Sequence, residues 1–165
     1  MDSPLGTLKL SMAGGELTGL DFTETSVKEQ IPDVLLDCAF QLRAYFNGEL
    51  KQFSIPLNLA GTPLQQQVWH LLTEIPYGET VTYGSLAARL GMRNGARAVG
   101  LANGANPLPV VIPCHRVIGA GGRLTGYGGG LWRKEWLLRM EAAHLPFTGE
   151  SNRQSAFSGG TLRLF

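Results

Sequence analysis

Apolar positions in the first third of the chain follow two different periods. Residues 5–12 and 16–22 flank the Ala13-Gly14-Gly15 turn and alternate apolar with polar side chains over 8–12 and 20–22, which predicts a β-hairpin. Residues 33–46 instead repeat apolar side chains along one helical face, which predicts a helix whose buried face carries Leu35, Cys38, Leu42 and Tyr45. Cys38 lies on that face, and we therefore expect it in the core rather than in a site.

The pattern changes near residue 60. Residues 53–59 alternate and predict a half-buried strand, which Pro56 limits to a sheet edge or a bulge. An apolar stripe over residues 63–75 then predicts a helix. Thr62 and Gln65 have the spacing of a capping box at its start.

Two short helices are predicted next, over residues 83–90 and 95–103, with a tight Gly/Asn turn between them. This arrangement resembles a helix-turn-helix. The second helix is rich in Gly and Ala and has Arg97 as its only charge, so its backbone can approach another surface closely. That surface is either a DNA groove or a neighbouring helix, and the composition alone leaves both open.

Charge separates the two parts of the chain. Residues 1–60 carry four basic and eight acidic side chains, whereas residues 61–147 carry eight basic and four acidic ones. Such asymmetry is expected when only the second part meets a polyanion, although it also arises by chance. We predict an α+β protein with a small N-terminal antiparallel sheet and helix (1–60), a mainly helical, winged-helix-like domain (61–147) and a mobile tail (148–165).

Composition limits the cellular setting. No apolar run is long enough to span a bilayer, and the N-terminus lacks the order of a signal peptide. Two cysteines do not make a disulfide framework, and no cluster has zinc-site spacing. We therefore expect a cytoplasmic protein without membrane contact, metal or cofactor.

The second cysteine lies in a different setting from Cys38. The apolar run 110–112 predicts a buried strand or extended segment, and Pro113 stiffens its end just before Cys114. His115 follows and can accept a proton near neutral pH. The pair is either a buried structural cysteine beside a histidine or a nucleophile with its base.

A glycine-rich stretch and a helix follow this pair. Residues 119–130 include eight Gly or Ala but lack a phosphate-loop ending, which predicts a tight loop or wing lining a pocket. Residues 131–140 predict a helix that turns Glu141 toward the core. A buried carboxylate needs a partner, and His115 is the obvious one, unless Glu141 lies at a frayed end in water.

These residues resemble the O6-alkylguanine-DNA alkyltransferase family, whose active-site signature matches Ile112-Pro113-Cys114-His115-Arg116-Val117. Strong matching covers residues 61–141. Further matching motifs, in family order, are Gln67-Val68-Trp69, Ile75-Pro76-Tyr77-Gly78-Glu79, Tyr83-Gly84, Ala96-Arg97-Ala98-Val99-Gly100, Ala102-Asn103-Gly104-Ala105-Asn106-Pro107, Gly126-Tyr127-Gly128-Gly129-Gly130 and Lys134-Glu135-Trp136-Leu137-Leu138.

The resemblance implies a suicide transferase for direct-reversal DNA repair. The Cys114 thiolate would attack the alkyl carbon on guanine O6, with O4-alkylthymine as a second candidate substrate. His115 would take the thiol proton through a water, and Glu141 would orient His115. Asn106 would brace the active-site turn. Tyr83 would protonate or hydrogen-bond guanine N3 as the base leaves and would help to rotate the nucleotide.

The resemblance also implies a DNA surface and a base pocket. Arg97 would fill the gap left by the flipped base, because a stacked guanine cannot reach a buried thiol. The remaining DNA contacts would be Tyr83, Ala96, Ala98, Gly100, Ala102 and Arg116. The pocket would be lined by Pro109, Val117, Tyr127 and Gly128, where Gly128 replaces a serine common in relatives. The partner would be double-stranded DNA containing O6-alkylguanine, bound by a monomer that can cluster on DNA and so associate with the nucleoid.

Two other functions compete with this one. A helix-turn-helix protein that binds DNA without transfer chemistry would have no use for Cys114. A cysteine hydrolase would turn over repeatedly, but the sequence marks no separate peptide or ester cleft. The chain also departs from many relatives in starting at Asp2-Ser3-Pro4-Leu5-Gly6, where they carry a further strand. The sequence leaves open whether this start is truncated, and with it the edge of the first sheet.

Overall fold

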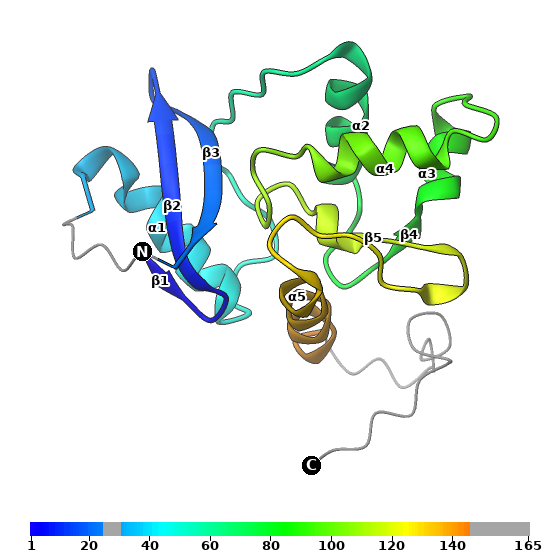
Figure 1. The fold of residues 1–165 in the computed structure, drawn as a ribbon. Coiled ribbons are helices and arrows are strands. Elements are labelled where there is room, and N and C mark those ends of the chain that lie inside the picture. Colours follow the sequence, from blue (N-terminus) through cyan, green and yellow to red (C-terminus); the bar gives the residue numbers. More distant parts are fainter. Residues whose placement is uncertain (25–30, 146–165) are drawn as a thin grey trace.

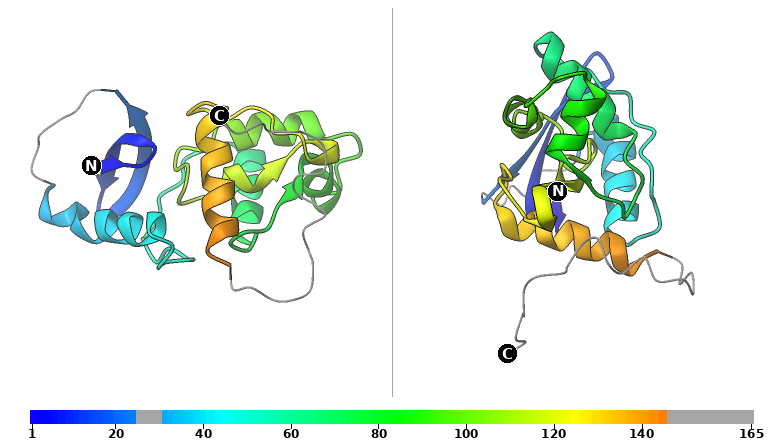
Figure 2. Two further views of the ribbon diagram at one scale, coloured as in Figure 1. Left: turned by 90° about the horizontal axis from the view of Figure 1, so that it is seen from below. Right: turned by 90° about the vertical axis from the view of Figure 1, so that its right-hand side faces the viewer.

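The computed structural model describes residues 1–24 and 31–145. Its elements form a sheet-and-helix region and a mainly helical region that lie side by side (Figure 1 and Figure 2). This arrangement confirms the predicted α+β class. No helix in the described ranges is both long and apolar enough to cross a membrane. The predicted tail at 148–165 lies outside the described residues.

The first region is built on a three-stranded antiparallel sheet in the order β1-β2-β3. Strands β2 (Gly6–Ala13) and β3 (Glu16–Thr23) form the predicted hairpin. Strand β1 (Asp2–Ser3) was not predicted, because two residues are too few to show a period. Helix α1 (Asp33–Phe46) has the predicted bounds, and Cys38 is 2% exposed in the core as expected.

The strand predicted over residues 53–59 is absent from the structure. The segment makes only an isolated parallel bridge between Leu17 and Leu57. The Leu17 amide donates to the Pro56 carbonyl at 2.8 Å, and the Asn58 amide donates to the Leu17 carbonyl at 3.0 Å. Pro56 has no N–H to extend this ladder, so the alternating pattern reflects half-burial without sheet pairing.

The second region contains the predicted helix-turn-helix. Helix α2 (Pro63–Thr73) begins with the predicted capping box, in which Thr62 Oγ1 accepts from the Gln65 amide and Gln65 Oε1 accepts from the Thr62 amide. Helices α3 (Tyr83–Arg89) and α4 (Ala96–Gly104) follow. Helix α4 packs against both α2 and α3, so its small residues serve helix packing on at least one side.

The rest of this region positions the Cys114 segment. A short 3₁₀ helix, η1 (Cys114–Arg116), leads directly into strand β5 (Val117–Ile118), which pairs in parallel with β4 (Val81–Thr82). The predicted glycine-rich loop follows and contains the 3₁₀ turn η2 (Ala120–Gly122). Helix α5 (Leu131–Ala143) closes the region and packs against η1.

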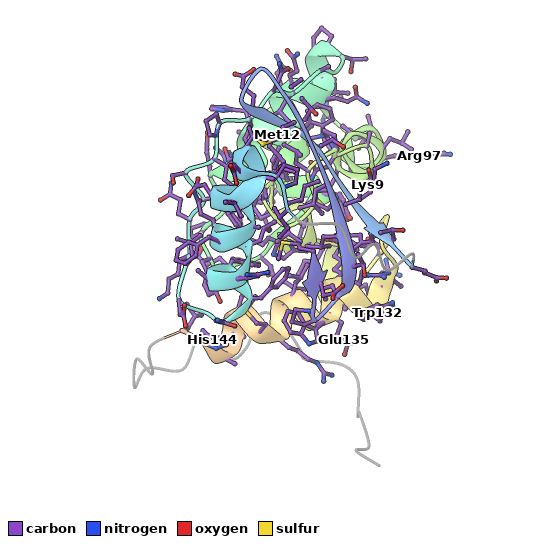
Figure 3. All side chains as sticks on the ribbon, turned by 90° about the vertical axis from the view of Figure 1, so that its left-hand side faces the viewer. Lys9, Met12, Arg97, Trp132, Glu135 and His144 are labelled. Atoms are coloured by element: carbon purple, nitrogen blue, oxygen red, sulfur yellow. The ribbon has the colours of Figure 1, made fainter. Side chains whose placement is uncertain are left out.

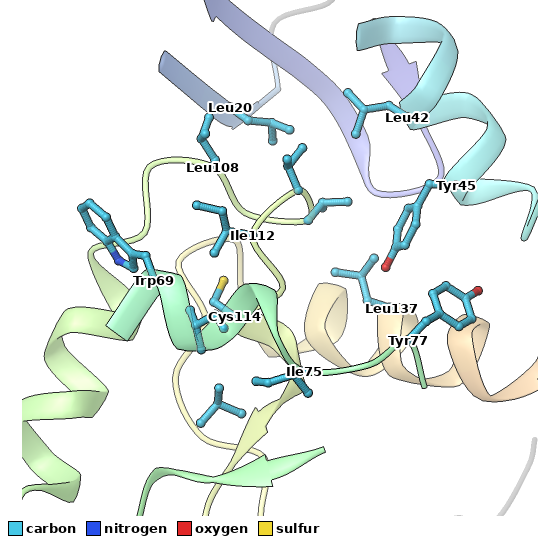
Figure 4. Packing of buried hydrophobic residues seen from close by; sticks show 14 of the residues in the cluster. Leu20, Leu42, Tyr45, Trp69, Ile75, Tyr77, Leu108, Ile112, Cys114 and Leu137 are labelled. Carbon is cyan, nitrogen blue, oxygen red and sulfur yellow. The ribbon is translucent and has the colours of Figure 1, made fainter. Parts of the chain in front are cut away.

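A continuous apolar core joins the two regions. Leu20 and Leu42 from the first region belong to the same cluster as Ile112 and Leu137 from the second. Cys114 also belongs to it, with its sulfur among these apolar side chains (Figure 4). The thiol is therefore held by packing from both regions, which sets its position before any substrate binds.

Candidate active site

Cys114 follows a constrained turn. Val110 has a φ of 77°, a left-handed conformation that β-branched residues rarely adopt. The Ile112 amide donates to the Leu108 carbonyl at 2.8 Å and closes the turn. Packing maintains this strained backbone, since the Val110 side chain is only 1% exposed.

Asn106 connects the two sides of the same turn. Its Nδ2 donates to the Ile112 carbonyl at 2.9 Å, and its Oδ1 accepts from the Leu108 amide at 3.0 Å. One side chain therefore satisfies two backbone groups that no sheet or helix pairs. This is the geometry that the predicted bracing role requires.

A cavity of about 230 Å³ opens beside Cys114. Its volume exceeds the ~30 Å³ share of one water molecule several-fold, so it can hold more than solvent. Three of the predicted pocket residues line it: Pro109, Tyr127 and Gly128. Val117 does not, which corrects that prediction: it is fully buried in β5 and its carbonyl accepts a hydrogen bond from Lys134 at 2.6 Å.

The first region forms one wall of this cavity. Leu20, Asp21 and Phe22 of β3 line it. The Leu20 amide donates to the Pro107 carbonyl at 2.9 Å, and the Phe22 ring lies 6.2 Å from the Tyr127 ring. The sequence pattern of β3 predicted a strand but no site, because the contact that brings it to the cavity is long-range.

The carboxylate of Glu141 is fully buried and accepts hydrogen bonds from residues that are distant in the sequence. The predicted pairing of Glu141 with His115 is present, at 2.9 Å between Oε1 and Nε2. Arg116 donates from Nη2 to Oε1 at 2.8 Å and from Nε to Oε2 at 3.0 Å. The Gly78 amide donates to Oε2 at 2.9 Å and the Tyr45 hydroxyl to Oε1 at 2.5 Å.

This arrangement sets the tautomer of His115. An ionised carboxylate only accepts hydrogen bonds, so Nε2 carries the proton that faces Glu141. Nδ1 then has a free lone pair, and it has no hydrogen-bond partner among the described residues. The imidazole is thus held in the form that can accept a proton at Nδ1.

Protonation states agree with this role. Burial raises the pKa of Glu141, but hydrogen bonds from His115 and Arg116, together with the charge of Arg116, outweigh it and hold the pKa well below its ordinary value. Burial lowers the pKa of His115, so the ring is neutral at neutral pH. Burial raises the pKa of Cys114 to about 11, opposed by the Asn106 hydrogen bond and the Lys134 charge. The resting site therefore holds a protonated thiol at Cys114 and a neutral base at the next residue.

Lys134 places a buried amine next to this site. Its Nζ donates to the carbonyls of Val117 at 2.6 Å and Thr125 at 2.9 Å, and lies 3.5 Å from the Tyr83 hydroxyl. Burial lowers the pKa of Lys134 to about 8. In the sequence, Lys134 stands out only as part of the motif Lys134-Glu135-Trp136-Leu137-Leu138, because nothing in a helical pattern distinguishes a buried lysine from a solvated one.

The small-residue helix α4 presents one charged side chain to solvent. Arg97 is exposed and extends from α4 away from the body of the protein (Figure 3). Ala96 is also exposed, and Ala98 and Gly100 are half-buried. The Tyr83 ring lies beside Gly100, where an added Cβ would be 3.7 Å from Cδ1. These positions form one surface at the helix-turn-helix.

Two residues predicted to contact DNA do not lie on this surface. Ala102 is 4% exposed, and its carbonyl accepts from Trp69 Nε1 at 2.9 Å. Arg116 is 6% exposed, and its guanidinium is bound to Glu141 and the Ile75 carbonyl. The prediction is corrected for both, because their polar groups are used inside the protein.

No group of three or more His, Cys, Asp or Glu side chains able to hold a metal occurs within the described residues. The functional side chains that the structure assembles are therefore a thiol, an imidazole, a carboxylate and their hydrogen-bond donors. Such a set can move a proton and form a covalent bond through sulfur.

Two family models match nearly the whole described chain. Residues 63–143 match the DNA-binding domain of 6-O-methylguanine DNA methyltransferase, and residues 1–59 match the ribonuclease-like domain of the same family. The methylated-DNA–protein-cysteine methyltransferase of Mycobacterium tuberculosis is 48% identical over 152 residues, covering 88% of this chain and 92% of that protein. The protein of that name in Methanosarcina acetivorans is 45% identical over 149 residues, with coverage of 86% and 96%.

Solved structures give the same similarity in three dimensions. The crystal structure of M. tuberculosis O6-methylguanine methyltransferase has a TM-score of 0.81 and 48% identity, covering 89% of this chain and 93% of that one. The structure of M. tuberculosis OGT in complex with DNA has a TM-score of 0.80 and 51% identity over the same shares. The fold described above is thus found in a DNA-bound relative.

Proposed function

Because this chain belongs to the 6-O-methylguanine DNA methyltransferase family, we propose that Cys114 is the residue that accepts the alkyl group. The activity is direct-reversal DNA repair, in which an alkyl group passes from DNA to a cysteine of the protein. One observation carries the assignment to Cys114. Its thiol borders the cavity, while the next residue is a neutral histidine held by a buried carboxylate.

The proposed substrate is O6-alkylguanine in double-stranded DNA, rotated out of the helix into the cavity. His115 takes the Cys114 proton at Nδ1, through a water molecule, and Glu141 stabilises the imidazolium that forms. The thiolate forms a bond to the alkyl carbon as the bond from that carbon to O6 breaks. The electron pair of the broken bond stays with guanine, and Tyr83 protonates N3 of the departing base.

The product is a thioether, which neither water nor a nearby group displaces. Each molecule therefore acts once, and we propose that it does so as a monomer. The proposed site needs no metal or cofactor, since Cys114 supplies the attacking electron pair, His115 and Glu141 accept and stabilise its proton, and Tyr83 supplies the proton that the departing base takes up. A protein that repairs DNA acts in the compartment that contains DNA, which supports the expected cytoplasmic, nucleoid-associated location.

The bounds of the two matching family models, 1–59 and 63–143, support a division of the chain into two domains near residue 60.

Exposure to O6-benzylguanine tests the assignment directly. We expect the intact mass to rise by one benzyl group, on Cys114 alone, with one equivalent of guanine released and no turnover. Peptide mapping locates the adduct. A DNA-binding protein without transfer chemistry gives no adduct, and a cysteine hydrolase gives repeated turnover, so either result contradicts the proposal.

Arg97 is proposed to fill the gap that the rotated base leaves in the duplex. Replacing it with alanine should slow repair of a methylated duplex by roughly 10–100-fold, because rotating a base costs a few kcal/mol that the arginine offsets. Reaction with free O6-benzylguanine, which needs no rotation, should keep its rate. Single-turnover kinetics on both substrates measure the two rates.

The matched control for Arg97→Ala is Arg139→Ala. Arg139 is an exposed arginine on α5 that pairs with Glu135 at 2.6 Å, so this variant loses the same charge elsewhere. It should repair duplex and free base at the original rates. Equal slowing of both substrates in Arg97→Ala would contradict the base-rotation role.

A further inference from the structure

The first region of the chain reaches the buried carboxylate through a single hydroxyl. Tyr45 lies near the end of α1, 96 residues before Glu141 in the sequence, and donates to its Oε1 at 2.5 Å. The same hydroxyl lies 3.3 Å from Nε2 of His115. Tyr45 is 0% exposed, and its hydroxyl points from α1 toward α5 (Figure 4). It is therefore in contact with both members of the proton-accepting pair.

Aromatic packing fixes the direction of this hydroxyl. The Tyr45 ring lies 5.6 Å from the Phe46 ring, 5.1 Å from the Phe53 ring and 6.0 Å from the Tyr77 ring. A ring enclosed on several sides cannot turn its hydroxyl elsewhere without leaving the core. The hydrogen bond to Glu141 is thus set by the position of α1.

Each hydrogen bond to the Glu141 carboxylate affects how strongly that carboxylate binds the proton on His115 Nε2 and how firmly it is held in place. Oε1 accepts from Tyr45, His115 and Arg116, whereas Oε2 accepts from Arg116 and the Gly78 amide. Without the hydroxyl, Oε1 has one fewer donor, and its negative charge is shared by fewer hydrogen bonds. The carboxylate then both binds the imidazole proton more strongly and is held less firmly in place.

We propose that Tyr45 is a positioning residue of alkyl transfer, through which α1 orients the Glu141–His115 pair for proton transfer from Cys114. The proposal rests on the proposed function, because it assumes that His115 serves as the base. It adds a catalytic contribution from the first region, whose sequence pattern predicts only a sheet and a helix. It differs from a purely structural role, since a tyrosine that only fills the core has no effect on the acidity of His115.

The pH dependence of transfer separates these two roles. The titratable and charged groups that face His115 and Glu141 are Tyr45 from α1, Tyr77, Arg116 and Cys114 from η1, and Lys134 from α5. Tyr45→Phe removes one hydroxyl and leaves the other groups in place. The imidazole then becomes more basic, so the acid limb of the rate profile should move to higher pH.

The experiment compares three full-length proteins: the wild type, Tyr45→Phe and Gln41→Leu. Gln41 is 8% exposed on the same helix. Its Oε1 accepts from the Ser54 amide at 2.9 Å and its Nε2 donates to Asp37 Oδ2 at 2.9 Å, so its loss removes two part-buried hydrogen bonds of α1 outside the site. Benzyl transfer from O6-benzylguanine is followed by intact mass between about pH 5 and 9, spanning the ordinary histidine range.

We expect Tyr45→Phe to react about tenfold more slowly at neutral pH, since misplaced catalytic groups have effects of this order or larger. Its acid limb should lie at higher pH than that of the wild type, and Gln41→Leu should keep the wild-type limb. A wild-type rate and limb in Tyr45→Phe would overturn this inference alone, as would an equal shift in Gln41→Leu. A wild type that forms no adduct on Cys114 would overturn the proposed function and this inference together.

Discussion

Replacing Cys114 with serine should abolish alkyl transfer while DNA binding persists. The expected loss is on the order of 10⁴-fold or more, as for other nucleophiles removed from catalytic sets. A hydroxyl is a far weaker nucleophile than a thiolate, and this buried position disfavours any anion, since it already raises the pKa of the thiol to about 11. Intact mass after exposure to O6-benzylguanine measures transfer, and fluorescence anisotropy with a duplex measures binding.

Cys38 provides the matched control for this variant. Burial also raises its pKa to about 11, so the two thiols are alike in acidity and burial. Only Cys114 borders the cavity and precedes a histidine held by a carboxylate. Cys38→Ser should therefore still react. Loss of DNA binding in Cys114→Ser, to the same degree as loss of transfer, would indicate that Cys114 is structural.

Replacing Glu141 with glutamine should destabilise the protein strongly and slow transfer. The substitution leaves the buried guanidinium of Arg116 without its counter-charge, which costs about 3–5 kcal/mol in comparable pairs. It also removes the anion that stabilises a charged His115. Urea unfolding at pH 7 measures the first effect, and transfer to O6-benzylguanine measures the second.

The destabilisation in Glu141→Gln should depend on pH. Because the folded pKa of Glu141 lies below its unfolded value of about 4.3, the carboxylate contributes its stability above that value and loses it as pH falls. The difference in unfolding free energy between wild type and variant should therefore shrink below about pH 4. A constant difference across this range would contradict the assigned ion pair.

A double substitution tests whether the unpaired charge of Arg116 causes the destabilisation in Glu141→Gln. Adding Arg116→Met to Glu141→Gln removes the unpaired charge and should recover much of the lost stability, because apolar replacements of buried ion pairs are often tolerated. Transfer should remain slow in the double variant, since His115 still lacks its carboxylate. Recovery of transfer together with stability would indicate that Glu141 has no part in the chemistry.

Local pattern was sufficient for the elements whose residues interact with near neighbours. The bounds of α1 and the capping box of Thr62 and Gln65 depend on contacts a few residues apart, and the β2–β3 hairpin depends on two segments joined by a short turn. The same reasoning was wrong for residues 53–59. There the alternation was real, but whether a half-buried segment joins a sheet depends on a partner strand elsewhere in the chain.

Single residues were assigned least well where their partners are distant. Arg116 follows the cysteine and histidine and was predicted to contact DNA, yet it is bound to Glu141. Tyr45 was recognised only as part of an apolar face, although its hydroxyl reaches the same carboxylate. A sequence pattern indicates that a side chain is buried, but not which polar group it meets there.

The sequence by itself determined which chemistry this protein carries: a thiol after a stiff apolar run, a histidine beside it, an acid turned toward the core and a family signature around them. Only the tertiary structure decided how that chemistry is held. In the folded chain, β3 lines the cavity, Tyr45 of α1 donates a hydrogen bond to Glu141, and Arg116 is buried. The physical reason is that residue type and spacing fix local conformation and reactivity, whereas burial and hydrogen-bond partners depend on segments that meet only when the chain has folded.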